Sequence, residues 1–268
     1  MRLIRFLDNE LNVRTGTPVD GRTARLLVAG EQGRYVFEDR VVGISQLLPP
    51  AVPPNIFAVG RNYRGHIEET GARPPERPLI FQKPTTSLTG HEGAVVLPVG
   101  APDEVDFEAE LAIVIGRKAR CVEPEAALDY VEGYTCANDV TARDCQRMDK
   151  QWSRAKGFDT FCPLGPWLVG AGDVDPDNLR IQCRLNGQVM QDANTNQMIF
   201  SCGRLVSYLS HQFTLLPGTV ILTGTPEGVG FARRPPVYLR PGDRVEVEIE
   251  GIGTLVNYVR ASSERSRF

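Results

Sequence analysis

The stretch Val105–Gly116, VDFEAELAIVIG, places acidic residues directly before the most hydrophobic run of the chain. Alternate residues of a β-strand point to opposite faces, so Asp106, Glu108 and Glu110 are predicted to share one face. Residues 111–115 are all apolar, which predicts a strand buried on both faces. The acids could simply face water. Alternatively, they bind a cation, because carboxylates crowded at the end of a buried strand cannot all remain ionised.

The overall composition is that of an ordinary globular protein. The chain has 268 residues, 41% hydrophobic and 24% charged, and can bury a core without disulfides. Its net charge of −3 gives no general attraction to nucleic acid or anionic lipid. The six cysteines occur singly and are predicted to be reduced thiols. Because no apolar run resembles a membrane span or a signal peptide, we expect a cytoplasmic protein that binds neither nucleic acid nor membrane.

The chain is predicted to contain many short strands and few helices. Residues 1–46 hold three short strands, which indicate a small β-rich N-terminal domain, and residues 47–55, LLPPAVPPN, form a stiff proline-rich linker. Residues 56–268 form the main domain, a β-rich α+β fold rather than a doubly wound one. The expected strands are 3–7, 24–28, 34–37, 56–59, 78–82, 94–97, 105–116, 133–137, 167–169, 180–185, 188–191, 219–223 and 244–250, and the clearest helices are 123–131 and 202–213.

A second acidic site lies in GYTCANDVTARDCQ, residues 133–146. The first five residues predict a strand, and residues 141–144, TARD, match a capping box that opens a helix. Asp139 then lies in the turn between strand and helix, where functional sites are commonly built.

If these two strands pair, Asp139 meets Glu108 and Glu110 at one point. Three carboxylates suit a hard cation, Mg²⁺ or Mn²⁺ before Ca²⁺, and the lack of histidine and cysteine in the cluster argues against zinc. Asp106 lies about 7 Å further along the strand, so we expect it to be exposed or to support the ligands from behind.

Nearby polar residues are candidates for catalysis. Arg143 and Gln146 are three residues apart and share a helix face, and Lys156 follows in a glycine-containing stretch. Each cation alone could be an ordinary surface charge, but donors that follow a metal ligand are suited to hold a developing oxyanion. In NYRGHIEE, His66 and Glu69 are also three apart, so the carboxylate could orient the imidazole as a general base. A histidine–glutamate pair is by itself a weak signal.

Two loops could contact a substrate. One ends a strand at Lys83, and the other is the glycine-rich LTGTPEGVG, residues 222–230, in which the Gly224 amide and the Thr225 hydroxyl could bind a carboxylate. The second loop lacks the Gly-Lys-Ser/Thr ending of a P-loop, and no dinucleotide-binding motif follows an early strand. Nucleotide binding is therefore disfavoured.

Taken together, these segments resemble the fumarylacetoacetate hydrolase family, especially its small acylpyruvase-like and fumarylpyruvate hydrolase-like members. The resemblance implies a mixed β-sandwich or roll, usually dimeric, so a homodimer is expected. Val59 stands where the animal fumarylacetoacetate hydrolases carry an additional metal-binding aspartate, which favours the shorter acylpyruvase-like group. The matching segments, in family order, are AVGRNYRGHIEE, PLIFQKPTTSL, VDFEAELAIVIGRKAR, GYTCANDVTARDCQ, RAKGFDTFCPLGPWLV, NTNQMIF and LTGTPEGVG.

The resemblance also implies roles for individual residues. Mg²⁺ or Mn²⁺ would be bound by Glu108, Glu110 and Asp139, with Ca²⁺ as a non-native occupant. His66 and Glu69 would activate water on a mobile lid. The implied oxyanion donors are Arg143, Gln146 and Lys156, and the implied substrate contacts are Lys83, Thr225 and Gly224.

The function expected from this pattern is metal-dependent hydrolysis of a carbon–carbon bond in an acylpyruvate-type dioxo acid, giving pyruvate and a carboxylate. His66, oriented by Glu69, would take a proton from the attacking water, and Lys156 would stabilise the oxyanion. An oxaloacetate decarboxylase or a keto-acid double-bond isomerase would use the same metal enolate, and the sequence separates these activities poorly. A non-catalytic cation-binding protein is the remaining alternative.

Overall fold

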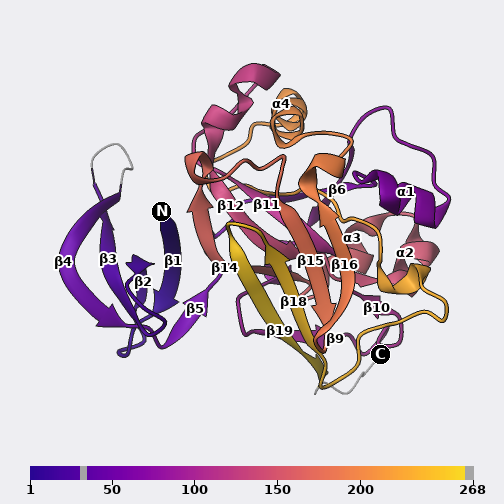
Figure 1. The fold of residues 1–268 in the computed structure, drawn as a ribbon, viewed down its shortest axis with the longest axis horizontal. Coiled ribbons are helices and arrows are strands. Elements are labelled where there is room, and N and C mark those ends of the chain that lie inside the picture. Colours follow the sequence, from indigo (N-terminus) through magenta and orange to yellow (C-terminus); the bar gives the residue numbers. More distant parts are fainter. Residues whose placement is uncertain (31–34, 263–268) are drawn as a thin grey trace.

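The computed structural model describes residues 1–30 and 35–262 of the chain. The described residues form a 12-stranded, a five-stranded and a two-stranded sheet, with only short helices beside them. Figure 1 shows the five-stranded sheet packed on the middle of the large sheet, with β1 to β5 as a lobe at one end. The predicted β-rich α+β fold is confirmed.

The large sheet runs in the order β4-β3-β2-β1-β14-β12-β11-β17-β6-β7, with β5 on β1 and β8 on β14. Because β1 pairs with both β2 and β14, the N-terminal lobe continues the main sheet. Strand β5 pairs with β1 and crosses the predicted domain boundary, and the division into domains stays a prediction. The strands of this sheet are β1 (Arg2–Leu7), β2 (Val13–Pro18), β3 (Thr23–Ala29), β4 (Tyr35–Gly43), β5 (Gln46–Leu48), β6 (Ile56–Gly60), β7 (Leu79–Lys83), β8 (Leu88–Thr89), β11 (Ala109–Ile115), β12 (Val131–Asn138), β14 (Cys162–Gly170) and β17 (Val220–Leu222).

The five-stranded sheet includes a strand that the sequence analysis missed, β19. In β19 every second residue from Leu255 to Val259 is buried, but the middle one is Asn257, which hides the apolar alternation. Its amide donates to the carbonyl oxygens of Gly90 and Gly93, so this polar residue is satisfied inside the core. The strands of this sheet, in order, are β16 (Gln188–Asn194), β15 (Arg180–Leu185), β18 (Arg244–Ile249), β19 (Gly253–Ala261) and β9 (Ala94–Leu97).

The α-helices are α1 (Arg64–Thr70), α2 (Arg143–Asp149), α3 (Trp152–Gly157) and α4 (Cys202–Gln212). Helix α4 confirms one predicted helix, whereas the other, at 123–131, is the 3-10 helix η3 (Pro124–Tyr130). The predicted capping box is wrong: Ala142 precedes α2, and Thr141 instead donates to the carbonyl oxygen of Asp139 at 2.8 Å. β2 was also missed, and Arg34, the expected start of a strand, lies outside the described residues.

The opening acidic stretch forms two strands rather than one. Strand β10 (Val105–Asp106) pairs with β13 (Thr141–Ala142), and β11 begins only at Ala109. All seven residues of β11 are buried, which confirms a strand covered on both faces. On one face Leu111 and Ile113 pack towards the five-stranded sheet, and on the other Val114 packs with residues of β6 and β14. The core therefore lies on both sides of β11 and holds its N-terminal end rigidly.

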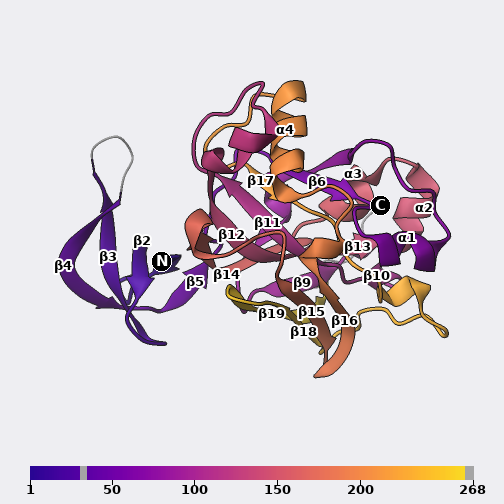
Figure 2. The same cartoon turned by 45° about the horizontal axis from the view of Figure 1, so that its top comes forward.

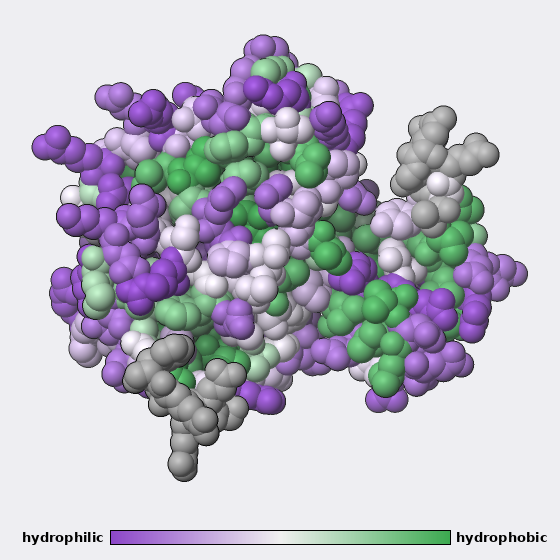
Figure 3. All heavy atoms as spheres, turned by 180° about the vertical axis from the view of Figure 1, so that it is seen from behind, coloured by the Kyte–Doolittle hydropathy of each residue, from purple (hydrophilic) through white to green (hydrophobic). Residues whose placement is uncertain are grey.

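Figure 2 shows α1, α2 and α3 gathered at one side of the molecule, around the ends of β10 and β13. At the opposite end, apolar side chains gather on the surface of the N-terminal lobe, as Figure 3 shows. Among the described residues, none of the helices combines the length and apolar character needed to span a bilayer. The cytoplasmic location and the homodimer stay predictions. The exposed apolar residues on strands of the lobe are Val13, Val28, Tyr35, Val36, Phe37 and Val41.

Gly133, in the middle of β12, tests the packing of the large sheet. A Cβ atom there would lie 2.1 Å from the carbonyl oxygen of Val169, whereas one at Gly172 would meet nothing within 4 Å. We predict that Gly133→Ala lowers the free energy of unfolding by about 1–3 kcal/mol in a denaturant titration, because β12 and β14 must move apart to make room for the methyl group. Gly172→Ala is the control and should change it by less than about 0.5 kcal/mol. Equal effects of the two substitutions would contradict the predicted packing.

Candidate active site

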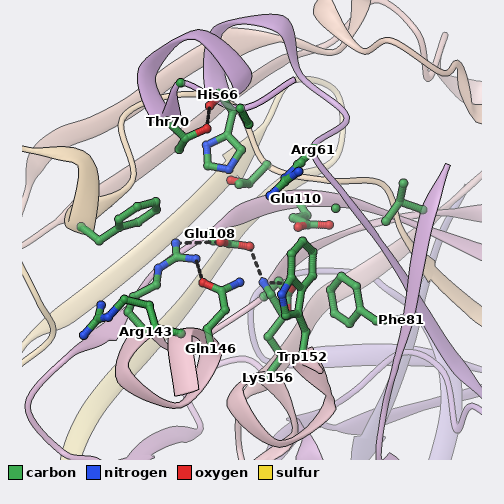
Figure 4. A pocket seen from close by; sticks show the side chains of 18 residues that line it. Arg61, His66, Thr70, Phe81, Glu108, Glu110, Arg143, Gln146, Trp152 and Lys156 are labelled. Atoms are coloured by element: carbon green, nitrogen blue, oxygen red, sulfur yellow. Dashed lines mark hydrogen bonds and ion pairs between the residues drawn. The ribbon is translucent and has the colours of Figure 1, made fainter. Parts of the chain in front are cut away.

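A cavity of about 460 Å³ lies where the helices α1, α2 and α3 meet the N-terminal end of β11. Figure 4 shows that its polar side chains come from several separate segments and point towards one another. Most of the predicted site residues line it: His66, Glu108, Glu110, Asp139, Arg143, Gln146, Lys156 and Thr225. Three predicted site residues do not line it: Glu69, Lys83 and Gly224.

Three carboxylates meet at one point of this cavity. Antiparallel pairing of β11 with β12 sets Ala109 opposite Asn138, which brings Asp139 beside Glu108 and Glu110. One oxygen from each carboxylate lies within 4.8 Å of the other two, and all three residues are buried. The expected juxtaposition is therefore present, and its geometry suits a hard cation with oxygen ligands.

Cationic side chains hold two of these carboxylates. Lys156 Nζ donates to Glu108 at 2.7 Å and to Asp139 at 2.6 Å, and Nη2 of Arg143 lies 2.7 Å from the other oxygen of Glu108. The Arg143 contact is an ion pair without the alignment of a hydrogen bond. Against the effect of burial, the charges of Lys156 and Arg143 lower the pKa of Glu108 to about 2. Glu108 is thus ionised at neutral pH.

Glu110 lacks such a partner. It accepts a hydrogen bond from the Gly224 amide at 2.6 Å but forms no ion pair within the described part of the chain. Burial, followed by the charges of Asp139 and Glu108, raises its pKa well above the usual range. A divalent cation held by Glu110 together with Glu108 and Asp139 would remove this repulsion, so the residues present fit a metal. Mg²⁺ and Mn²⁺ match the all-oxygen set.

Lys83 and Gly224 contact the carboxylates of the site but do not line the cavity. Lys83 is fully buried, contacts Asp139 and donates to the carbonyl oxygen of Phe161 at 2.8 Å. The Gly224 amide is occupied by Glu110, and its φ of +100° favours glycine. The predicted contacts of Lys83 and Gly224 with substrate stay predictions, and neither residue lines the cavity.

His66 and Glu69 form the expected pair on α1. His66 Nδ1 lies 2.8 Å from Oε1 of Glu69. Because a carboxylate only accepts hydrogen bonds, Nδ1 carries the proton and Nε2 is free to accept one. The other oxygen of Glu69 accepts the Gly228 amide at 2.9 Å, which ties α1 to the loop after β17. Figure 4 shows the imidazole pointing into the cavity, above Glu108.

Gln146 and Thr225 complete the polar lining. Arg143 Nη1 donates to Oε1 of Gln146 at 3.0 Å, which leaves the amide nitrogen of Gln146 as a donor for a ligand. Thr225 accepts a hydrogen bond from Gln191, whose own oxygen accepts the Ala109 amide. Gln191 therefore ties the Thr225 loop to the start of β11. The role of Gln191 could not be predicted from the sequence, because only the register of β16 places its side chain beside Thr225 and Ala109.

Asp106 contacts Arg143 from behind the lining, and Arg61 is a lining residue that was not predicted from the sequence. Asp106 was expected to be exposed or supporting, and the exposed alternative is wrong, because it is fully buried and donors surround it. Arg61 lines the cavity, and its φ of +57° is uncommon for a residue with a side chain. Its position in the quoted AVGRNYRGHIEE segment was the available signal. The apolar side chains that line the cavity are Val59, Ala72, Phe81, Trp152 and Phe231.

Comparison with known proteins identifies the family. Residues 55–260 match the domain described as fumarylacetoacetate (FAA) hydrolase C-terminal. The chain belongs to the fumarylacetoacetate hydrolase family. A human mitochondrial oxaloacetate tautomerase is 48% identical over 81% of this chain and 69% of its own length.

Solved structures of this fumarylacetoacetate hydrolase family cover 98% of the chain and all of their own. One is a 5-carboxymethyl-2-hydroxymuconate delta-isomerase from Mycobacterium smegmatis, 43% identical with a TM-score of 0.87. Another is a fumarylacetoacetate hydrolase from Exiguobacterium antarcticum, 35% identical with a TM-score of 0.85. The family thus contains enzymes named for tautomerisation, isomerisation and hydrolysis.

Glu110 provides a test of the cation site with two opposite effects. We predict that Glu110→Gln weakens Mn²⁺ binding on the order of 100-fold in calorimetric titration, because one charged ligand is lost. Without metal, the same variant should melt at a higher temperature at neutral pH, because the folded protein disfavours the ionised form of Glu110 and a neutral side chain does not carry that cost. Asp103→Asn, an exposed acid with 86% of its side chain accessible, is the control and should change neither quantity. Unchanged Mn²⁺ affinity in Glu110→Gln would exclude this site.

Proposed function

We propose that this protein is a divalent-metal-dependent enzyme that relocates a proton on 2-oxo dicarboxylic acids, as a keto–enol tautomerase or double-bond isomerase. The observation that carries the proposal is the His66–Glu69 pair, whose free ring nitrogen faces a buried carboxylate triad across one cavity. The names of the relatives support it, since oxaloacetate and 5-carboxymethyl-2-hydroxymuconate both carry several acid groups.

The metal, when bound, would act as a Lewis acid that makes the carbon next to a carbonyl group more acidic. Glu108, Glu110 and Asp139 would hold it. His66 would take the proton from that carbon at Nε2 and deliver it to the carbonyl oxygen in a tautomerisation or to a different carbon in a double-bond shift, so no other reactant is needed. Glu69 keeps the imidazole oriented and stabilises its protonated form throughout the transfer.

Arg61 supplies a place for a second acid group. Unlike Arg143 and Arg147, which are paired with acids, Arg61 forms no ion pair within residues 1–30 and 35–262. Figure 4 shows its guanidinium directed into the cavity on the side of Glu110. A free guanidinium recognises a carboxylate by paired hydrogen bonds, so Arg61 would bind the substrate's distal carboxylate.

Hydrolysis of a carbon–carbon bond in an acylpyruvate is the second candidate. The same pair would take a proton from water instead of carbon, and Lys156 with Arg143 could stabilise the resulting oxyanion. The likeness to the Exiguobacterium hydrolase supports it. Decarboxylation of oxaloacetate is a further alternative, which would need no attack by water.

One panel of substrates separates these activities. Purified protein with Mn²⁺ or Mg²⁺ is offered oxaloacetate, acylpyruvates and unsaturated 2-oxo diacids, and enol absorbance, pyruvate and CO₂ are recorded separately. The proposal expects metal-dependent changes in enol absorbance without stoichiometric pyruvate or CO₂. Pyruvate release from acylpyruvates would instead establish the hydrolase, and inactivity on the whole panel would favour a protein that only binds cations.

His66→Ala should lower the rate on the best substrate by about 10²–10⁴-fold, because the general base is lost. Mn²⁺ affinity, measured by calorimetry, should stay within a factor of about 3 because the ligands are untouched. His211→Ala, on α4 and away from the cavity, is the control and should retain full activity. Full activity in His66→Ala would overturn the assignment of the base.

Arg61→Leu should raise KM for a dicarboxylic substrate about tenfold or more, since a charge-assisted pair is lost. For a monocarboxylic 2-oxo acid the KM should change little, because no distal carboxylate is present. Arg73→Leu, an exposed arginine outside the cavity, is the matched control. An equal increase in KM for both classes of acid would refute the proposed contact.

A further inference from the structure

Asp106 is a fully buried carboxylate that contacts the lining residues Arg143 and Phe231 and is not among the proposed metal ligands. We propose that Asp106 is a positioning residue that holds Arg143 and the turn at Gly230–Phe231 together as one wall of the cavity. The proposal rests on the proposed function only for its kinetic readout, and the binding experiment below is independent of it.

Within the described part of the chain, the Asp106 carboxylate accepts four hydrogen bonds. Its Oδ1 accepts the backbone amides of Phe107 at 2.9 Å and Gly230 at 2.8 Å. Its Oδ2 accepts the Phe231 amide at 3.0 Å and Nε of Arg143 at 2.9 Å. Asp106 thereby joins three segments that are distant in sequence: β10, α2 and the 3-10 helix η6 (Gly230–Ala232).

The turn is shaped for this carboxylate. A Cβ atom at Gly230 would lie 2.5 Å from Oδ1 of Asp106 and 1.9 Å from the carbonyl oxygen of Val237, so only glycine allows the approach. The next residue, Phe231, places its ring over the guanidinium of Arg143, with Cζ 4.3 Å from the ring centroid. Arg143 is therefore held by a carboxylate at its edge and by an aromatic ring at its face.

The contacts with Asp106 and Phe231 determine which edge of the Arg143 guanidinium faces the site. Nε donates to Oδ2 of Asp106, Nη2 lies between that oxygen at 2.9 Å and Glu108 at 2.7 Å, and Nη1 donates to Gln146. Without Asp106, the guanidinium would no longer be fixed against the Gly230–Phe231 turn and would lose its present orientation. The orientation of Gln146 would be lost at the same time, because Arg143 decides which end of its amide faces the cavity.

Chemical complementation tests the wall directly. Arg143→Ala leaves a space bordered by Asp106, Glu108 and Phe231, into which free guanidinium should bind, as followed by NMR titration. Adding Asp106→Asn should weaken this binding about tenfold or more. The negative charge is lost, and the NH₂ group of the introduced side chain would face hydrogen-bond donors. Glu104→Gln, from the exposed Glu104–Arg147 pair, is the matched control and should leave guanidinium binding unchanged.

Two further measurements guard against a purely structural effect. Asp106→Glu keeps the buried charge but shifts the carboxylate by one bond, and it should weaken guanidinium binding to a similar degree. In the otherwise unchanged protein, Asp106→Asn should lower kcat/KM about tenfold while Mn²⁺ affinity stays within about threefold. Guanidinium that binds equally with and without the Asp106 substitutions, or not at all to Arg143→Ala, would overturn the proposal.

Discussion

The structure depends on balancing four carboxylates that are buried together where β10 and β11 meet the end of β12. Carboxylates in a protein interior are strongly disfavoured unless cations or donors surround them. Three buried cationic side chains compensate three of the four, which leaves Glu110 without an ion pair among the described residues. The acids are Asp106, Glu108, Glu110 and Asp139, and the cations are Lys83, Arg143 and Lys156.

This carboxylate without an ion pair gives the cavity its chemical character. A divalent cation held by Glu110, Glu108 and Asp139 would relieve the repulsion among these carboxylates, which face the side chains of α1 and α2. The sheets explain why the site can be so crowded, since β11 is covered on both faces and its acids cannot move apart. In the proposed mechanism, the acids held by this packing bind the cation, and His66 on the short helix α1 transfers the proton.

The sequence was sufficient for the features that follow from strand periodicity and pairing. Glu108 and Glu110 are two residues apart, and Asp139 directly follows the neighbouring strand, so their meeting required only that the two strands pair. For Asp106 the sequence left an exposed and a supporting role open, because the strand breaks after it and nothing local shows that its partners lie at Gly230 and Arg143. The contact of Lys83 with Asp139 could not be predicted for a related reason, because a lysine that ends a strand can point either to a substrate or to a buried acid.

The most direct test of the central claim follows hydrogen exchange at the carbon next to the 2-oxo group of oxaloacetate in D₂O by NMR. The account predicts that the Mn²⁺-loaded protein exchanges this hydrogen faster than the spontaneous reaction. It also predicts that the acceleration disappears with His66→Ala while the metal remains bound. Exchange at the spontaneous rate with the native protein, or equal acceleration by the variant, would contradict proton transfer by the His66–Glu69 pair.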